Sequence, residues 1–120
     1  MVTPTTLAAW PVFETDELAA VDAVLRSGRV NYWTGTACRD FERAWSDAHQ
    51  GMHCLSMANG SLTMDAALRV LGIGAGDEVI VSPRSYVASA MCVALCGATP
   101  VFADVDLESG CMTADTAEAV

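Results

Sequence analysis

The chain has 120 residues, of which 52% are hydrophobic, and its 6 basic and 15 acidic side chains give a formal charge of −9. This composition is too apolar for a disordered segment. The negative charge argues against nucleic acid and anionic membranes as partners, because both are bound by clustered basic side chains. The sequence contains no lysine, so a mechanism that needs a lysine amine cannot draw it from this chain.

Two helices are predicted in the first fifty residues. Thr15 and the two acids after it suit a helix N-terminus, and Gly28 suits its end. A second helix is expected over residues 36–50, where apolar side chains recur every three or four positions. The loop between the helices is either a site of aromatic packing or a binding or subunit-contact loop. Its central residues are Tyr32, Trp33, Thr34 and Gly35.

An alternation of strands and helices is predicted next. Short apolar runs indicate strands at residues 54–57, 78–81 and 101–105, with helices over 59–71 and 86–96 between them. The strand centres recur at intervals of about 22 to 25 residues, which is typical of parallel βαβ units. The predicted fold class is therefore α/β, with a mostly parallel sheet and flanking helices.

The last residues predict a further helix. Thr113 suits an N-cap, and residues 114–120 suit the first turns of a helix. A helix this short is marginal unless it is packed, and a three-stranded sheet leaves open edges. We therefore expect the fold to continue in a longer chain or in a partner.

Several features of the chain admit other interpretations. The uncharged stretch 85–103 is apolar enough for a membrane span, but Gly97–Pro100 divides it, which favours a buried helix and a strand. Cys92 and Cys96 would share a helix face, yet two ligands are too few for a closed metal site. We favour small buried thiols for these two residues. Because the N-terminus has no signal-peptide pattern, we expect reduced cysteines in a cytoplasmic protein.

Two features follow predicted strands, at the edge where open α/β sheets bind ligands. The turn Asn59-Gly60-Ser61 precedes a helix, and the N–H groups of Gly60, Ser61 and Leu62 are expected to face outward and bind a phosphate. An ordinary helix start is the alternative. Tyr86 is expected to stack on a flat ring, and a core tyrosine is the alternative. Together they predict a planar phosphorylated ligand such as pyridoxal 5′-phosphate (PLP).

Six motifs occur in order along nearly the whole chain. They are Trp10-Pro11, Val24–Gly28, Phe41-Glu42, Ala58–Ser61, Ala67–Val81 and Gly97–Asp106. The series resembles the N-terminal part of the DegT/DnrJ/EryC1/StrS family of PLP-dependent sugar aminotransferases. It matches only the beginning of that family's chain.

The resemblance implies the N-terminal part of the large domain of a fold-type I, aspartate aminotransferase-like, PLP-dependent transferase. Residues 1–52 would form an N-terminal helical segment with a subunit-contact loop. Residues 53–120 would form the first, incomplete βαβ units of the PLP-binding domain. The resemblance also implies a homodimer, with the loop at residues 32–35 near an active site formed between two subunits.

The resemblance assigns cofactor contacts to residues already singled out. Asn59, Gly60 and Ser61 match the family's phosphate loop, with serine in place of the usual threonine, and Tyr86 matches the ring-stacking aromatic. The lysine that binds the cofactor covalently and the aspartate that pairs with the pyridine nitrogen lie beyond the matched part of the family.

The resemblance implies an enzyme that moves an amino group from glutamate or glutamine to a keto-sugar, commonly nucleotide-linked, in amino-sugar, lipopolysaccharide or antibiotic biosynthesis. The 120 residues alone are expected to be inactive because they lack the lysine. One alternative is a split enzyme with a lysine-bearing partner chain. Two others are a non-catalytic phosphate-binding or assembly module and an unrelated flavodoxin-like phosphate binder.

Overall fold

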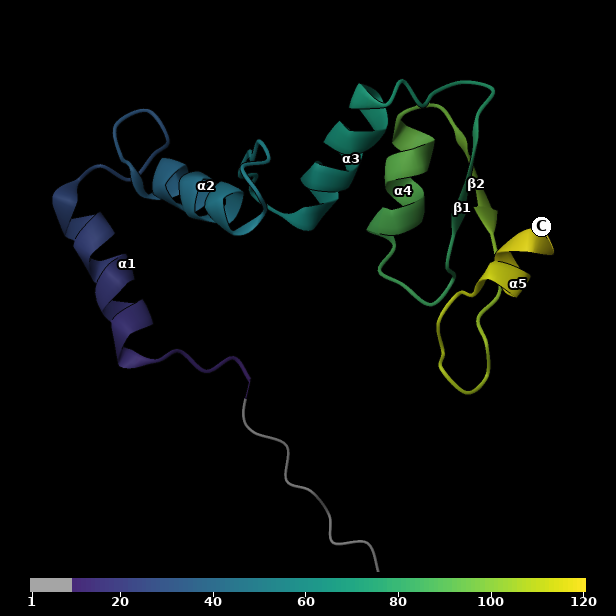
Figure 1. Ribbon diagram of the computed structural model, residues 1–120, viewed down its shortest axis with the longest axis horizontal. Helices are drawn as coiled ribbons and strands as arrows, with labels where there is room; N and C mark the ends of the chain where they lie inside the picture. Colours follow the sequence, from purple (N-terminus) through teal and green to yellow (C-terminus); the bar gives the residue numbers. More distant parts are fainter. Residues whose placement is uncertain (1–9) are drawn as a thin grey trace, which may run out of the picture. The chain divides into compact units, whose positions relative to one another are not determined.

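The structure is a computed structural model, and it describes residues 10–120 (Figure 1). Its contacts divide the chain into two compact units, one ending at Ser56 and the other beginning at Met57. The described residues of the first unit, 10–56, contain two helices. The second contains three helices and a two-stranded sheet.

The first unit is built from α1 (Thr15–Ser27) and α2 (Ala37–Ala48). Helix α1 starts one residue earlier than predicted. Glu14 is its N-cap, and the backbone N–H of Glu14 donates to the Glu17 carboxylate at 2.7 Å in a capping box. Thr15 is therefore the first helical residue, because the glutamates supply the cap that we assigned to it. Gly28 ends α1 as predicted, in the left-handed conformation at φ 68°.

The second unit alternates helices and strands as predicted. Its elements are α3 (Gly60–Val70), β1 (Glu78–Val81), α4 (Ala88–Leu95), β2 (Thr99–Phe102) and α5 (Ala114–Glu118). Strands β1 and β2 pair in parallel, with Val79 opposite Pro100 and Ile80 opposite Val101. The Thr113 hydroxyl accepts the Thr116 N–H at 3.3 Å, which confirms Thr113 as the cap of α5.

The strand predicted at residues 54–57 is absent from the described chain. These residues belong to no helix or strand, and the sheet of the described part has two strands. The backbone N–H of Ser56 donates to the Glu42 carboxylate at 2.8 Å. A side chain thus occupies a backbone donor that a strand partner would otherwise bind.

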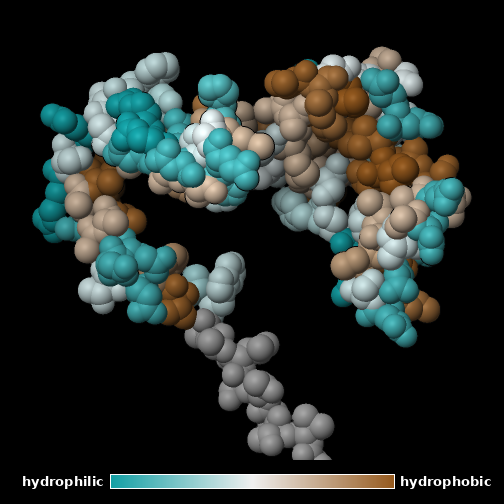
Figure 2. Space-filling view, viewed as in Figure 1, coloured by the Kyte–Doolittle hydropathy of each residue, from teal (hydrophilic) through white to brown (hydrophobic). Residues whose placement is uncertain are grey.

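A small core holds the second unit together. The buried residues Val81, Val93 and Ala98 pack with partly buried neighbours that include Leu68 and Ile73. Helix α4 contacts α3 and both strands, so its near-absence of polar side chains matches its central position. Figure 2 shows further hydrophobic side chains on the surface of this unit.

Candidate functional site

The turn before α3 is organised by Asn59. Asn59 is the N-cap, and its side-chain Oδ1 accepts the Leu62 N–H at 3.0 Å. The Thr63 hydroxyl donates to the Asn59 carbonyl at 3.2 Å. A Cβ built on Gly60 would meet no atom within 4 Å, so a ligand has free access to the backbone there. The fold therefore presents the start of α3 as an open turn.

The donors at this turn differ in one respect from the prediction. The Leu62 N–H is bonded to Asn59 and is not free for a ligand, because the capping side chain reaches it first. Within the described part of the chain, the N–H groups of Gly60 and Ser61 have no acceptor. These two donors and the Ser61 hydroxyl lie at the positive end of the helix dipole, an arrangement that favours an anion.

Tyr86 lies beyond the carboxyl end of β1, just before α4. Its side chain is 76% exposed, so it is not the core tyrosine of the alternative prediction. It lines a hollow of about 270 Å³ whose other walls come from the turn after β1, the start of α4 and β2. The lining residues are Ser82, Pro83, Ser85, Tyr86, Val87, Ser89, Ala90 and Phe102. An exposed ring beside a hollow is free to stack on a planar ligand.

Both candidate features occur at the same end of the second unit. Helices α3 and α4 begin at the end where β1 and β2 finish (Figure 1). The Cys92 thiol of α4 donates to the carbonyl of Ser61 at 3.4 Å, which ties α4 to the first turn of α3. A second hollow of about 350 Å³, lined mainly by residues of α3, α4 and β1, shares Ser82, Ser85 and Ser89 with the hollow beside Tyr86.

A contact that the sequence did not indicate closes the loop after β2. The Arg84 guanidinium donates to the carbonyl of Gly110 at 3.3 Å, joining the turns that follow the two strands. In the same loop, the backbone N–H and hydroxyl of Ser109 each donate to Asp106 at 2.8 Å. These bonds hold the pKa of Asp106 below its ordinary value, with the backbone bond as the largest cause.

The loop predicted to bind substrate or a subunit has a defined conformation in the first unit. Asn31 Oδ1 accepts the N–H groups of Trp33 and Thr34, both at 3.0 Å. The Arg39 guanidinium donates to the carbonyls of Tyr32 at 2.5 Å and Gly35 at 2.6 Å. Trp33 is 87% exposed, and its ring meets that of Tyr32 edge-on at 5.8 Å.

Glu42 connects this loop to the segment after α2, a role that the sequence prediction missed. Its carboxylate accepts the N–H of Ser56 at 2.8 Å, the hydroxyl of Ser56 at 2.9 Å and the hydroxyl of Tyr32 at 3.1 Å. These bonds, with the Ser56 N–H as the largest cause, hold the pKa of Glu42 below its ordinary value. The bond to Glu42 raises the pKa of Tyr32.

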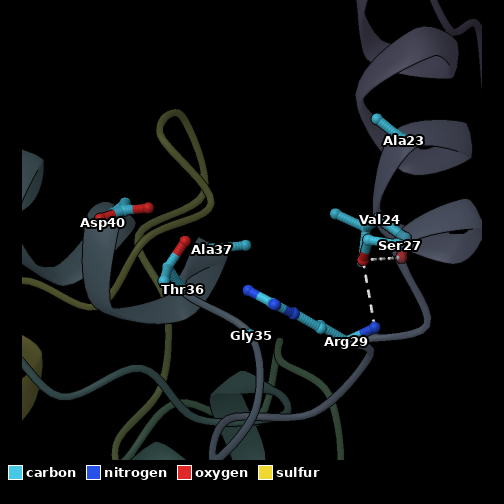
Figure 3. Close-up of a pocket in the computed structure, with 8 residues that line it drawn as sticks. All are labelled: Ala23, Val24, Ser27, Arg29, Gly35, Thr36, Ala37 and Asp40. Atoms are coloured by element: carbon cyan, nitrogen blue, oxygen red, sulfur yellow. Dashed lines mark hydrogen bonds between the residues drawn. The ribbon is translucent and has the colours of Figure 1, made fainter.

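A hollow of about 360 Å³ lies between α1 and the start of α2 (Figure 3). Its lining mixes small apolar side chains with Arg29 and Asp40. Ser27 shapes its edge, since its hydroxyl donates to the Val24 carbonyl at 2.7 Å and accepts the Arg29 N–H at 3.1 Å. Among the four central residues of the predicted loop, 32–35, Gly35 lines this hollow.

Two kinds of feature are absent from residues 10–120. In this part of the chain, no helix is both long and apolar enough to cross a membrane. No group of three or more His, Cys, Asp or Glu side chains is arranged there to hold a metal ion. The five cysteines, all within this part, are free thiols.

Comparison with known proteins relates this geometry to a family. The model of the DegT/DnrJ/EryC1/StrS aminotransferase family matches residues 11–120. An L-glutamine:2-deoxy-scyllo-inosose aminotransferase of Streptomyces kanamyceticus is 40% identical over 98% of this chain, which spans 29% of that relative.

Solved structures show the same fold. An aminotransferase from Psychrobacter cryohalolentis superposes with a TM-score of 0.86 at 48% identity, covering 94% of this chain and 29% of that protein. Spr1654 of Streptococcus pneumoniae, solved in a PLP-form, superposes with a TM-score of 0.77 at 33% identity, covering 91% of this chain and 27% of that protein. The chain thus has the α/β fold of part of a PLP-dependent aminotransferase, and it belongs to the DegT/DnrJ/EryC1/StrS aminotransferase family.

Proposed function

We propose that these residues form one part of the PLP site of an enzyme that transfers an amino group from glutamine or glutamate to a cyclic keto-sugar. The acceptor is either nucleotide-linked or a free ring ketone of the kind named for the Streptomyces relative. The main support is the pair of free N–H donors at the start of α3, in a unit whose exposed Tyr86 borders a hollow.

The donor set fits the cofactor. A phosphate ester needs several hydrogen-bond donors and a positive field, and Gly60 and Ser61 offer two N–H groups and a hydroxyl at a helix N-terminus. Tyr86 offers a flat, exposed ring. When bound, PLP supplies the electron sink that amino-group transfer requires.

The chain's own residues have binding and orienting roles in this proposal. Gly60 and Ser61 hold the phosphate, and Tyr86 packs against the ring and limits its tilt. Cys92 fixes the first turn of α3 through the Ser61 carbonyl. The amine that would bind the cofactor covalently comes from residues outside these 120, because the sequence has no lysine. We therefore expect the isolated segment to have no transaminase activity.

A cytoplasmic homodimer is part of the same proposal. The free thiols of the five cysteines suit a reducing compartment. The exposed Trp33 on its hydrogen-bonded loop suits a contact between subunits, because interface cores are enriched in tryptophan.

The test is an assay of the whole protein that contains these residues. It is supplied with PLP, L-glutamine or L-glutamate, and either 2-deoxy-scyllo-inosose or a nucleotide-linked keto-sugar. We expect amino-group transfer to one of these acceptors. Ser61→Ala should weaken PLP binding about tenfold through the lost hydroxyl bond, whereas Ser46→Ala on α2 should not.

Two results would count against the proposal. Absence of transfer to every cyclic ketone tested, in a folded protein, would refute the aminotransferase function. PLP binding without turnover would instead favour the alternative of a non-catalytic binding module.

A further inference from the structure

We propose that Glu42 is a positioning residue that fixes the loop of residues 31–35 for ligand binding by acting through Tyr32. This inference rests on the function proposed above. The Glu42 carboxylate contacts Tyr32, ten residues earlier, and Ser56, fourteen residues later. One half-buried side chain on α2 therefore joins the loop before the helix to the segment after it.

Glu42 acts together with Arg39, which precedes it by about one helical turn. Arg39 binds the loop's backbone through the carbonyls of Tyr32 and Gly35, while Glu42 binds the Tyr32 hydroxyl. The Arg39 guanidinium also lies 5.5 Å from the centroid of the Tyr32 ring. The backbone and side chain of Tyr32 are thus fixed from the same helix.

The loop has little room for another conformation. A Cβ on Gly35 would lie 2.5 Å from the backbone oxygen of Arg29, so the chain passes close to itself there. Asn31 holds the N–H groups of the next turn. Within residues 10–120, hydrogen bonds join the loop to the segment at Ser56 through Glu42.

The exposed Trp33 is the group that this arrangement positions. Its indole is 87% exposed and rests edge-on against Tyr32 at 5.8 Å. A large aromatic side chain held in one position binds a ligand or subunit with little further loss of entropy. Without Glu42 the Tyr32 hydroxyl loses its bond, and Arg39 alone holds the ring against which Trp33 rests. We therefore expect weaker ligand binding through the loop and an unchanged rate of amino transfer.

The experiment compares four variants of the whole protein with wild type. They are Glu42→Ala, Glu42→Gln, Tyr32→Phe and the control Asp47→Asn. Asp47 is exposed on α2, and its side chain forms no hydrogen bond within residues 10–120. Hydrogen–deuterium exchange of the peptide spanning residues 31–35 reports the loop directly. Steady-state kinetics give KM for the amino acceptor and kcat, and a titration gives PLP affinity.

We expect about tenfold faster exchange in the loop of Glu42→Ala, because a charge-assisted bond to Tyr32 is lost. KM for the acceptor should rise about tenfold while kcat and PLP affinity stay within about twofold of wild type. Glu42→Gln and Tyr32→Phe should show smaller changes in the same direction, and Asp47→Asn should match wild type. If Glu42→Ala does not fold, Tyr32→Phe carries the test.

The outcomes separate this inference from the proposed function. Unchanged exchange in the Glu42 and Tyr32 variants overturns the positioning role, and so does faster exchange with unchanged KM in an active enzyme. If the variants exchange faster than wild type but the wild-type protein itself never transfers an amino group, the proposed function is refuted. The link from Glu42 to the loop then still stands.

Discussion

The contact between Arg84 and Gly110 gives a sharp prediction for single residues. Gly110 has φ 63°, and a Cβ there would lie 1.5 Å from the Arg84 guanidinium nitrogen Nη1. Gly110→Ala should therefore destabilise the protein by about 1 kcal/mol through the left-handed backbone, with an added cost from displacing Arg84. Urea unfolding of the whole protein measures the change.

A double-mutant cycle separates the two costs. In the Arg84→Ala background, Gly110→Ala should lower the free energy of unfolding by the backbone cost alone, because there is no guanidinium left to displace. An equal cost in both backgrounds would mean that the guanidinium does not lie over Gly110.

Two carboxylates predict how stability depends on pH. The pKa values of Glu42 and Asp106 are lowered, chiefly by the backbone N–H groups of Ser56 and Ser109 respectively. Because each folded pKa is below its unfolded value, the stabilisation is present above the ordinary carboxyl pKa of about 4 and is lost as pH falls through the folded value. Asp106→Asn should therefore flatten the acid limb of stability in urea unfolding, and an acid limb identical to wild type would contradict this expectation.

At the scale of elements, the cap of α3 is the most direct test. Asn59→Ala removes the bond to the Leu62 N–H and should cost about 1 kcal/mol of stability, whereas Asn59→Asp keeps an acceptor and should cost less. Chemical denaturation of the whole protein distinguishes the two. An equal loss of stability in both variants would indicate that the bond from the Leu62 N–H to the side chain at position 59 does not stabilise the protein.

The elements also show what local sequence can predict. Periodicity and turn residues correctly predict helices α1 to α4 and both strands, because these depend on nearby residues. The prediction of a strand at residues 54–57 was wrong, because strand pairing depends on a neighbouring strand that the local sequence pattern does not specify. The role of Glu42 was missed for the same reason, because it appears only when Tyr32 and Ser56 are brought together.

At the scale of the whole molecule, the chain matches the N-terminal part of a longer family of enzymes. The resemblance read from ordered motifs is confirmed by the family match over residues 11–120. The chain spans about 29% of the curated relative it matches at 40% identity. Apolar side chains of α1 are well exposed, including Leu18 at 57% and Leu25 at 64%. We expect them to be covered in the whole protein.

A crystal structure of the whole protein with PLP tests the central proposal most directly. We predict phosphate oxygens within about 3 Å of the N–H groups of Gly60 and Ser61 and of the Ser61 hydroxyl, with the pyridine ring against Tyr86. A phosphate bound elsewhere, with the start of α3 facing solvent or filled by protein side chains, would contradict the account.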